Sequence, residues 1–573
     1  MPETLPAKGH PKGLYILFAT EMWERFNYYG MRAILVLFMT KALLFDDVFA
    51  SNLYGSYTSL VFLTPLLGGY IADRYWGNHR AIISGGIVMA IGELLLFCCG
   101  SLYHSAPHAS SLLFYSGLGL MIAGNGFFKP NISSMVGQLY PAGDRRIDSA
   151  YTIFYMGINT GGALGPFVCG MVGDTGNPAD FRWSFLAGGI AMTISVIVQK
   201  AFQHKYVVDP ERRILGLTPP GAPRRFLKPL AIIAGMLVLS FFTIGLLYVD
   251  LKKFEFLTYL LIAAPIFIAF IIFSDRALTS IQKKQVAVIF IVSFFVIFFW
   301  SAFEQAGASL TFFADRQTNR HLGLQIPVWL IYALSLLAAY FIYRLFVRVF
   351  KNLGSAGDAA LRNTVYFLLF LLAGALVIIN VLVIRKGGSN LSFEELPAST
   401  FQSLNSIFVV SFAPIFAWFW LKLGKREPAS PTKMAMGLAL LALGYLWIAF
   451  GVKDVQPAAK VSMIWLTGMY ALHTCGELCL SPIGLALVNK LAPFRFASLL
   501  MAVWFLANAI ANKLAGALSA LYPDKGRITS FLGYRMSNKY EFFMLFVFMA
   551  GTASVVLFCL TKSLQRMMNP AKK

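Results

Sequence analysis

The sequence predicts an all-α polytopic membrane protein, and three observations lead to that fold class. The 573 residues are 58% hydrophobic and only 13% charged, whereas soluble proteins contain about 25% charged residues. The mean hydropathy is +0.67, and 52 phenylalanines exceed what the available polar surface could cover in soluble cores. Apolar runs of about 17–25 residues, long enough to span a bilayer, recur along the chain. The composition therefore excludes soluble, disordered, collagen-like and coiled-coil proteins.

The net charge of +22 reports membrane topology rather than nucleic-acid binding. Basic residues gather in short segments between apolar runs, such as Arg212-Arg213 and Lys425-Arg426. Cytoplasmic loops of membrane proteins carry this excess of basic residues. We therefore expect both termini in the cytoplasm, the acidic links at Asp46-Asp47 and 174–180 outside, and no nucleic-acid partner.

Catalytic and metal-binding patterns are missing from the sequence. All six cysteines lie inside apolar runs, at spacings that fit neither a disulfide framework nor a zinc site. No nucleophile stands near a base in any recognisable motif. We therefore expect no enzymatic activity, no metal and no cofactor.

Apolar runs and polar links divide the first half of the chain into regular spans. A polar segment at 207–227, which contains Pro219-Pro220-Gly221, is typical of a cytoplasmic linker between bundles. It separates an N-terminal bundle at 1–206 from an inserted hairpin at 228–275. The spans predicted in this half are 13–42, 52–72, 80–101, 111–139, 149–173, 181–203, 228–249 and 256–274.

The second half, 284–573, is predicted to form a C-terminal bundle with a second inserted hairpin at about 326–384. Its spans are predicted at 285–313, 326–350, 361–384, 398–421, 433–452, 460–488, 495–521 and 541–562. The total is about sixteen spans. Each hairpin has an even number of spans and leaves its neighbours' orientation unchanged. Six core spans then stand on each side of the linker, which is the layout of the major facilitator fold, whose halves rock around a midplane site.

The first span carries charges that a membrane helix normally lacks. Glu21, Glu24, Arg25 and Arg32 each cost about 2.5–3.5 kcal/mol at a helix centre. At about 100° per residue they share a sector of about 100° with Tyr28. One polar stripe on an apolar helix predicts a face that lines an aqueous path. The alternative is a static salt-bridge cluster that fixes helix packing.

Other buried charges complement this stripe. Small residues before Lys129 allow close helix approach, so we expect Lys129 to pair with a carboxylate of the first span. Cations in the first half and Glu477 in the second match the charged ends of a short peptide, about 7 Å apart in a dipeptide. Glu21 and Glu24 exceed what one cation neutralises, so protonation would switch their pairing. The remaining intramembrane charges are interpreted as packing or snorkelling residues: Glu93 and Lys513.

Seven short motifs stand in order along the chain. They are Glu21-x-x-Glu24-Arg25-Phe26-x-Tyr28-Tyr29-Gly30, the basic loop 68–80, Phe154-Tyr155-x-x-Ile158-Asn159-x-Gly161, Phe303-Glu304-Gln305, Gln402-Ser403-Leu404-Asn405, Gly476-Glu477-Leu478-x-Leu480-Ser481-Pro482-Ile483-Gly484 and Trp504-Phe505-Leu506. Together they resemble the proton-dependent oligopeptide transporters, a family of the major facilitator superfamily. The resemblance extends from the first to the last span of the shared core.

The resemblance implies proton-driven import of di- and tripeptides across the bacterial inner membrane by a monomer embedded in the bilayer. The implied proton-coupling residues are Glu21, Glu24, Arg25, Lys129 and Glu304. The peptide carboxylate would be bound by Arg32 and Lys129, and the amino end by Asn159, Asn405 and Glu477. Side-chain pockets would be lined by Tyr28, Tyr29, Trp300, Ser481 and Trp504.

The sequence departs from the family pattern in two places. Phe62 stands where the family commonly has tyrosine, which removes one hydrogen bond worth about 1 kcal/mol and bears on peptide preference. The second hairpin at 326–384 lacks buried charges, so we interpret it as peripheral packing or a partner surface.

Other functions remain as alternatives at this stage. The same fold could carry another small anion or a peptide-like compound, such as nitrate or a modified peptide. A non-transporting nutrient receptor would bind without accumulating anything. The complete first-span motif together with Glu477 favours a substrate with both termini charged.

Overall fold

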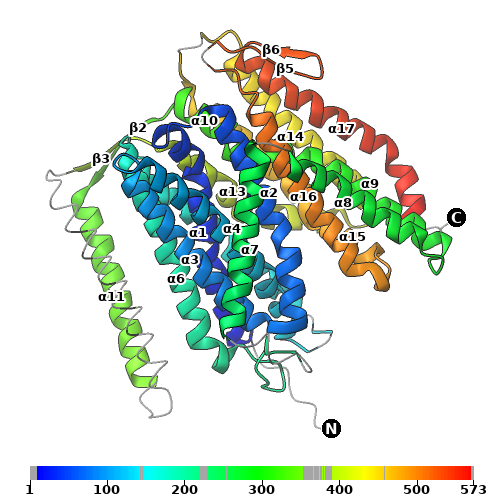
Figure 1. Cartoon of the computed structure of the whole chain (residues 1–573), viewed down its shortest axis with the longest axis horizontal. Coiled ribbons are helices and arrows are strands. Elements are labelled where there is room, and N and C mark those ends of the chain that lie inside the picture. The colour runs from blue at the N-terminus through cyan, green and yellow to red at the C-terminus, as the bar shows by residue number, and fades with distance from the viewer. Residues whose placement is uncertain are drawn as a thin grey trace.

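The computed structural model describes residues 9–568 apart from 142, 145, 220–228, 253–254, 353–365, most of 366–389, 457–458 and 525. Long helices dominate it (Figure 1), which confirms the predicted all-α membrane fold. Within the described residues, 11 helices are long and apolar enough to cross a membrane. The helices Lys12–Lys41, Asp47–Ile71 and Ile147–Gly173, which coincide with three predicted spans, are not among those 11.

The first bundle has six long helices whose bounds lie close to the predicted spans. They are α1 (Lys12–Lys41), α2 (Asp47–Ile71), α3 (Asn78–Leu102), α4 (Pro107–Gln138), α5 (Ile147–Gly173) and α6 (Phe181–Tyr206), with the short turns η1 (Ala72–Trp76) and η2 (Pro178–Asp180). Helix α1 packs against α5 and α6, and α3 packs against α4 and α6. Local signals fix the ends: Asp46 caps α2 by accepting from Val48 N at 2.9 Å, and Pro107 opens α4.

Two further helices follow the first bundle as the predicted hairpin, α7 (Pro229–Lys252) and α8 (Phe256–Ser274). Helix α7 packs on α4, where Thr243 Oγ1 donates to Gly119 O at 3.2 Å, and α8 packs on α16 of the second bundle. The described part of the predicted linker binds the start of α3, since His79 N donates to Gly216 O at 3.0 Å. Residues 220–227 of that linker lie outside the described part.

The second bundle is built from α9 (Ser280–Phe303), η4 (Glu304–Gly307), α10 (Ser309–Arg316), η6 (Ala398–Gln402), α13 (Ser403–Leu423), η7 (Gly424–Arg426), α14 (Ser430–Val452), α15 (Met463–Leu491), η8 (Phe494–Phe496), α16 (Ala497–Ser519) and α17 (Lys539–Met568). Helix α14 packs between α15 and α17, and α9 packs against α16 and α17. The bounds predicted for whole domains stay predictions.

The predicted span 285–313 is not continuous. It bends at η4 and continues as the short helix α10. A side chain at Gly307 would overlap the Tyr54 ring of α2, so the bend lets the two bundles approach closely here. No proline lies in Glu304–Arg316, where the helix is interrupted.

Short strands correct the purely helical prediction at one end of the molecule. The pairs are β1 (Thr318–Asn319) with β4 (Val461–Ser462), β2 (His321–Pro327) with β3 (Asn390–Glu395), and β5 (Thr529–Phe531) with β6 (Tyr534–Met536). Figure 1 shows β2, β3, β5, β6 and α10 at the upper end and the N-terminus at the lower end. We call the upper end the distal end.

The second predicted hairpin begins as predicted with α11 (Val328–Asn352). Figure 1 shows α11 standing apart from both bundles, joined to them through β2 and β3. The other predicted span, 361–384, lies mostly outside the described residues. The segment between β2 and β3 is called the inserted segment below.

The two bundles meet in the distal halves of their helices. A Cβ on Gly55 of α2 would lie 2.7 Å from the Cα of Gly516 on α16, so these helices pack at backbone distance. Ser403 Oγ of α13 donates to Ala163 O of α5 at 2.7 Å. The distal end is therefore closed in this structure.

Candidate functional site

The polar stripe of α1 is buried inside the protein, and the aqueous path that its spacing predicted stays a prediction. Glu21, Glu24, Arg25 and Tyr28 are at most 2% exposed, and Arg32 is 6% exposed. Burying this many charges is costly unless each finds a partner. The contacts of each charge therefore describe what the site can do.

Arg25 binds both acids of α1. Its Nε lies 3.2 Å from Glu21 Oε1, one helical turn away, and its Nη2 donates to Glu24 Oε1 at 2.7 Å. The Nε also contacts Glu24 Oε2. Asn125 of α4 donates to Glu24 Oε1 at 3.1 Å. One guanidinium thus serves two carboxylates, which leaves the cluster one proton short of neutrality when both acids are ionised.

Lys129 does not make the ion pair predicted for it. Its Nζ lies 4.6 Å from the ring centroid of Phe62 on α2. Among the described residues, no carboxylate lies within the ion-pair distance of 4.0 Å from Lys129. Both acids pair with Arg25 instead. The guanidinium of Arg25 is on the same helix as the two carboxylates, so it binds them without a contribution from another helix. The half-buried ammonium is left on an aromatic face.

Arg32 joins the two bundles. Its Nη2 lies 2.8 Å from Glu304 Oε2, and the two side chains are only 7% and 6% exposed. Glu304 begins η4, so the bend in the predicted span places this acid toward α1. The Tyr29 ring lies beneath the guanidinium, with its centroid 5.6 Å from Arg32 Cζ. A substrate carboxylate would therefore meet Arg32 in competition with Glu304.

An acid and an amide meet on the second bundle. Asn405 Nδ2 of α13 donates to Glu477 Oε2 of α15 at 2.8 Å and to Thr474 Oγ1 at 3.1 Å. Both Asn405 and Glu477 are half-buried. The two residues that the resemblance assigns to the amino end of the peptide thus lie in contact, and Asn405 leaves part of the carboxylate free to accept from another donor.

The remaining predicted site residues are aromatic or polar side chains of the same two bundles. Tyr28 and Tyr29 stack edge to face with centroids 5.3 Å apart, and Trp300 packs on Phe303 at 5.1 Å. Trp504 is 4% exposed, while Ser481 is half-buried. Asn159 donates to Tyr155 O of its own helix at 2.9 Å.

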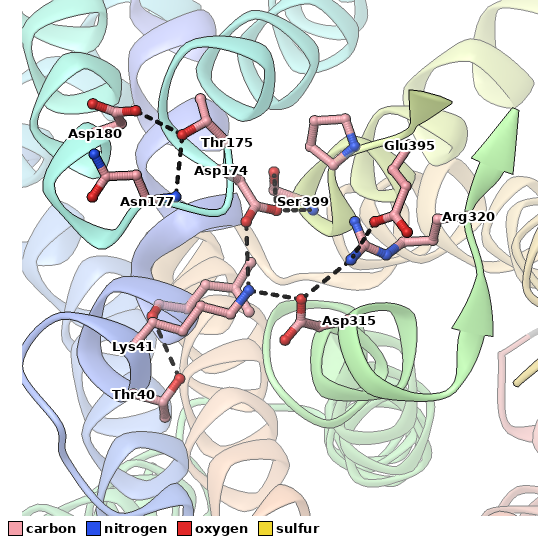
Figure 2. Close-up of polar contacts among 12 residues, drawn as sticks. Thr40, Lys41, Asp174, Thr175, Asn177, Asp180, Asp315, Arg320, Glu395 and Ser399 are labelled. Carbon is pink, nitrogen blue, oxygen red and sulfur yellow. Dashed lines mark hydrogen bonds and ion pairs between the residues drawn. The ribbon is translucent and has the colours of Figure 1, made fainter. Parts of the chain in front are cut away.

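A chain of charged side chains at the distal end was not predicted as functional. Figure 2 shows Lys41 between Asp174 and Asp315, with Asp315 also facing Arg320. Lys513, interpreted from sequence as a packing or snorkelling residue, donates to Ser56 Oγ across the bundle boundary at 2.8 Å. In the sequence, these charged residues resemble those that commonly flank membrane spans. The only signal for Lys513 was a charge inside a span.

Comparisons with known proteins agree with the arrangement. The family model described as the POT family matches residues 79–384 and 385–531. The chain is 32% identical to the uncharacterized transporter YclF of Bacillus subtilis (strain 168) over 545 residues, or 93% of this chain and 92% of the relative. It is 30% identical to the peptide transporter YePEPT of Yersinia enterocolitica over 532 residues, or 89% of this chain and 88% of the relative.

Solved structures resemble the whole chain. A crystal structure of a peptide transporter POT in complex with sulfate matches with a TM-score of 0.72 and 28% identity, covering 98% of this chain and 97% of the other. A POT family transporter in complex with 5-aminolevulinic acid matches with a TM-score of 0.72 and 25% identity, covering 97% of this chain and 98% of the other. The family match and the near full-length relatives show that this protein belongs to the POT family, whose members are membrane transporters of the major facilitator fold.

Proposed function

We propose that this chain imports di- and tripeptides together with protons, by alternating access between its two bundles. The observation that carries the proposal is the distribution of buried charge. Arg32 and Lys129 lie in the first bundle, whereas Glu477 with its partner Asn405 lies in the second. A zwitterionic peptide between the bundles would satisfy both sides. Relatives named as peptide transporters support this substrate class.

The peptide ends define two subsites. Arg32 and Lys129 bind the carboxylate, since Lys129 has no carboxylate partner among the described residues. Glu477, Asn405 and Asn159 bind the amino end. The peptide side chains lie in pockets formed by Tyr28, Tyr29, Trp300, Ser481 and Trp504. A clamp of fixed length selects peptides by length rather than by side chain.

Proton coupling resides in Glu21, Glu24 and Arg25. Two carboxylates share one guanidinium in a buried place, where an uncompensated charge is costly. A proton on one acid neutralises the cluster. Loss of that proton leaves a negative charge that Lys129 can attract, since Asn125, one helical turn before Lys129 on α4, already contacts Glu24, so the pairing of these four residues follows the proton.

Peptide binding and bundle movement are coupled through Arg32. The peptide carboxylate competes with Glu304 for the guanidinium, because Arg32 pairs with Glu304 at 2.8 Å in the distally closed state. Glu304, once released, accepts a proton. A peptide and a proton together thus replace the ion pair that joins the bundles.

The surroundings follow from the same proposal. The protein lies in the bacterial inner membrane as a monomer, with both termini in the cytoplasm and the distal end outside. Transport is driven by the proton gradient and needs neither a cofactor nor catalysis. The distally closed arrangement is then the inward-facing state.

Uptake of labelled di-alanine into proteoliposomes tests the proposal. We expect concentrative uptake with an inward proton gradient, and loss of that accumulation when an ionophore collapses the gradient. Absence of uptake in sealed vesicles that contain folded protein would contradict the proposal and direct attention to another cargo or to a receptor.

A further inference from the structure

Arg320 joins the two ends of the inserted segment. Arg320 lies between β1 and β2, where the chain enters the segment, and Leu396 follows β3, where the chain leaves it. Arg320 Nη1 donates to Leu396 O at 2.7 Å, and Leu396 N donates to Arg320 O at 3.0 Å. The entry and exit of the segment are therefore clamped together at this residue.

The same guanidinium faces the boundary between the bundles. Arg320 Nη2 lies 3.6 Å from Asp315 Oδ1 at the end of α10. Lys41 Nζ of α1 lies 2.7 Å from the same Asp315 Oδ1 and 3.6 Å from Asp174 Oδ1 at the end of α5. Figure 2 shows these side chains in one row, with charges that alternate in sign.

The row crosses from one bundle to the other at a single contact. Asp174 and Lys41 belong to the first bundle, whereas Asp315 and Arg320 belong to the second. The exit of the inserted segment reaches the row as well, since Ser399 N of η6 lies 3.4 Å from Asp174 Oδ2. The segment is thus tied to both sides of the boundary at the distal end.

The side chains of the row differ in exposure, and their ion pairs therefore differ in how much they stabilise the row. The side chains of Asp315 and Arg320 are 13% exposed and that of Asp174 is 4% exposed, whereas Glu395 beyond Arg320 is 55% exposed. Exposed ion pairs contribute little. The partly buried Arg320 therefore holds Asp315 together with Lys41, whereas its contact with the exposed Glu395 adds little.

We propose that Arg320 is a positioning residue of the distal gate, which is the contact of Lys41 with Asp315 across the bundle boundary: it holds Asp315 against Lys41 and so favours the distally closed state. The proposal rests on the proposed function in assuming that the distal end faces outside and opens during the transport cycle. Gate opening can be measured without transport.

Labelling of a buried cysteine measures that opening. Ser51 of α2 is fully buried, and a Cβ on Gly516 of α16 would lie 2.6 Å from its carbonyl oxygen, so a thiol there becomes reactive only when the bundles part. Ser51→Cys protein in intact cells is treated with a membrane-impermeant maleimide, and the labelling of the protein without that substitution is subtracted. At limiting reagent the labelling rate is proportional to the open fraction.

Removal of the guanidinium is expected to open the gate. In Arg320→Met, the labelling rate of Ser51→Cys should rise about fivefold, as for an ion pair at the strong end of the range for accessible sites. Arg320→Lys keeps the charge and should stay close to the parent. Glu395→Gln is the matched control, because it removes the contact on the exposed side of the same guanidinium, and it should leave labelling unchanged.

A double variant separates positioning from general loosening of the segment. If Arg320 acts through Asp315 on Lys41, Arg320→Met should add nothing in a Lys41→Met background. If Arg320→Met does not accumulate as folded protein, Asp315→Asn takes its place and should give the same rise. The proposal is overturned by unchanged labelling in the tested variant, by additive effects in the double variant, or by an equal rise in Glu395→Gln. Failure of di-alanine uptake in the parent protein would instead contradict the proposed function.

Discussion

At the scale of single residues, the contacts of Arg25 and Lys129 show how this membrane protein stabilises its buried charges. Arg25 satisfies two acids of its own helix, while Lys129 is left on the ring of Phe62. The ring offers an electrostatic attraction of about 0.5–2 kcal/mol but no hydrogen bond. An ammonium held in this way remains available to a carboxylate that arrives with the substrate. The departure of Phe62 from the family's tyrosine thus bears directly on Lys129.

Glu24→Gln should uncouple transport from the proton. Glutamine keeps the shape of the side chain but cannot gain or lose the proton that switches the pairing with Arg25. We expect accumulation of labelled di-alanine to be abolished and peptide counterflow, measured in the same vesicles, to remain. Glu211→Gln, at an exposed side chain of the linker, is the control and should keep both activities. Equal loss of counterflow and accumulation in Glu24→Gln would refute the coupling role.

We expect Arg32 to bind the peptide in addition to stabilising the fold through its ion pair with Glu304. Arg32→Ala leaves Glu304 buried without its partner, a loss of about 3–5 kcal/mol for a buried pair, and also removes the carboxylate subsite. Adding Glu304→Gln should recover the thermal stability of the purified protein. Peptide-induced stabilisation should stay absent in the double variant. Recovery of ligand stabilisation together with thermal stability would show that Arg32 does not bind the peptide.

The bounds of a helix were predictable from the sequence where they depend only on the residues of that helix. The span predicted at 256–274 is the observed α8, and the span at 149–173 differs from α5 by two residues at one end. The break at η4 was not predicted, because no proline marks it and the close approach of Gly307 to Tyr54 of the other bundle is a contact between distant parts of the chain. The distal strands were missed as well, since several contain only two or three residues and show no alternating pattern.

Gly307→Ala tests the importance of that break. A methyl group there would overlap the Tyr54 ring, so α2 and η4 could not approach as observed. We expect slower di-alanine uptake and faster maleimide labelling of Ser51→Cys, because the distal end can no longer close fully. Gly245→Ala is the matched control, since a Cβ at Gly245 of α7 meets no atom within 4 Å. Normal uptake by Gly307→Ala would show that the close approach is dispensable.

At the scale of the whole molecule, the two bundles contact each other at the distal end. This arrangement predicts that one bundle rocks against the other. The sequence predicted the two bundles from the even-numbered insertions and the linker. The resemblance assigned Asn405 and Glu477 to one subsite, and the two side chains are in contact in the structure. The sequence could not show that Arg32 pairs with Glu304 or that Lys41 meets Asp315, since these contacts form between helices far apart in the sequence and depend on the conformational state.

A disulfide across the bundles should stop the movement. A Cβ on Gly162 of α5 would lie 3.5 Å from Ser406 Cβ on α13, a separation that suits a disulfide. The double variant Gly162→Cys with Ser406→Cys should lose uptake under oxidising conditions and regain it after reduction. Each single variant serves as a control and should be insensitive to oxidation. Unimpaired uptake by the oxidised double variant, with the disulfide verified by mass, would argue against movement at this contact.

The partial exposure of the distal row has a consequence for the medium in which the protein works. Dissolved ions reach Lys41, whose side chain is 32% exposed, but have little access to Arg32 and Glu304 deeper in the protein. The screening length falls from about 10 Å at 0.1 M salt to about 3 Å at 1 M. With the distal end outside, as we propose, rising external salinity weakens the ion pairs of Lys41, Asp315 and Arg320 while leaving the pair of Arg32 and Glu304 intact. A cell in brine would thus hold more of its carriers open to the outside than a cell in fresh water.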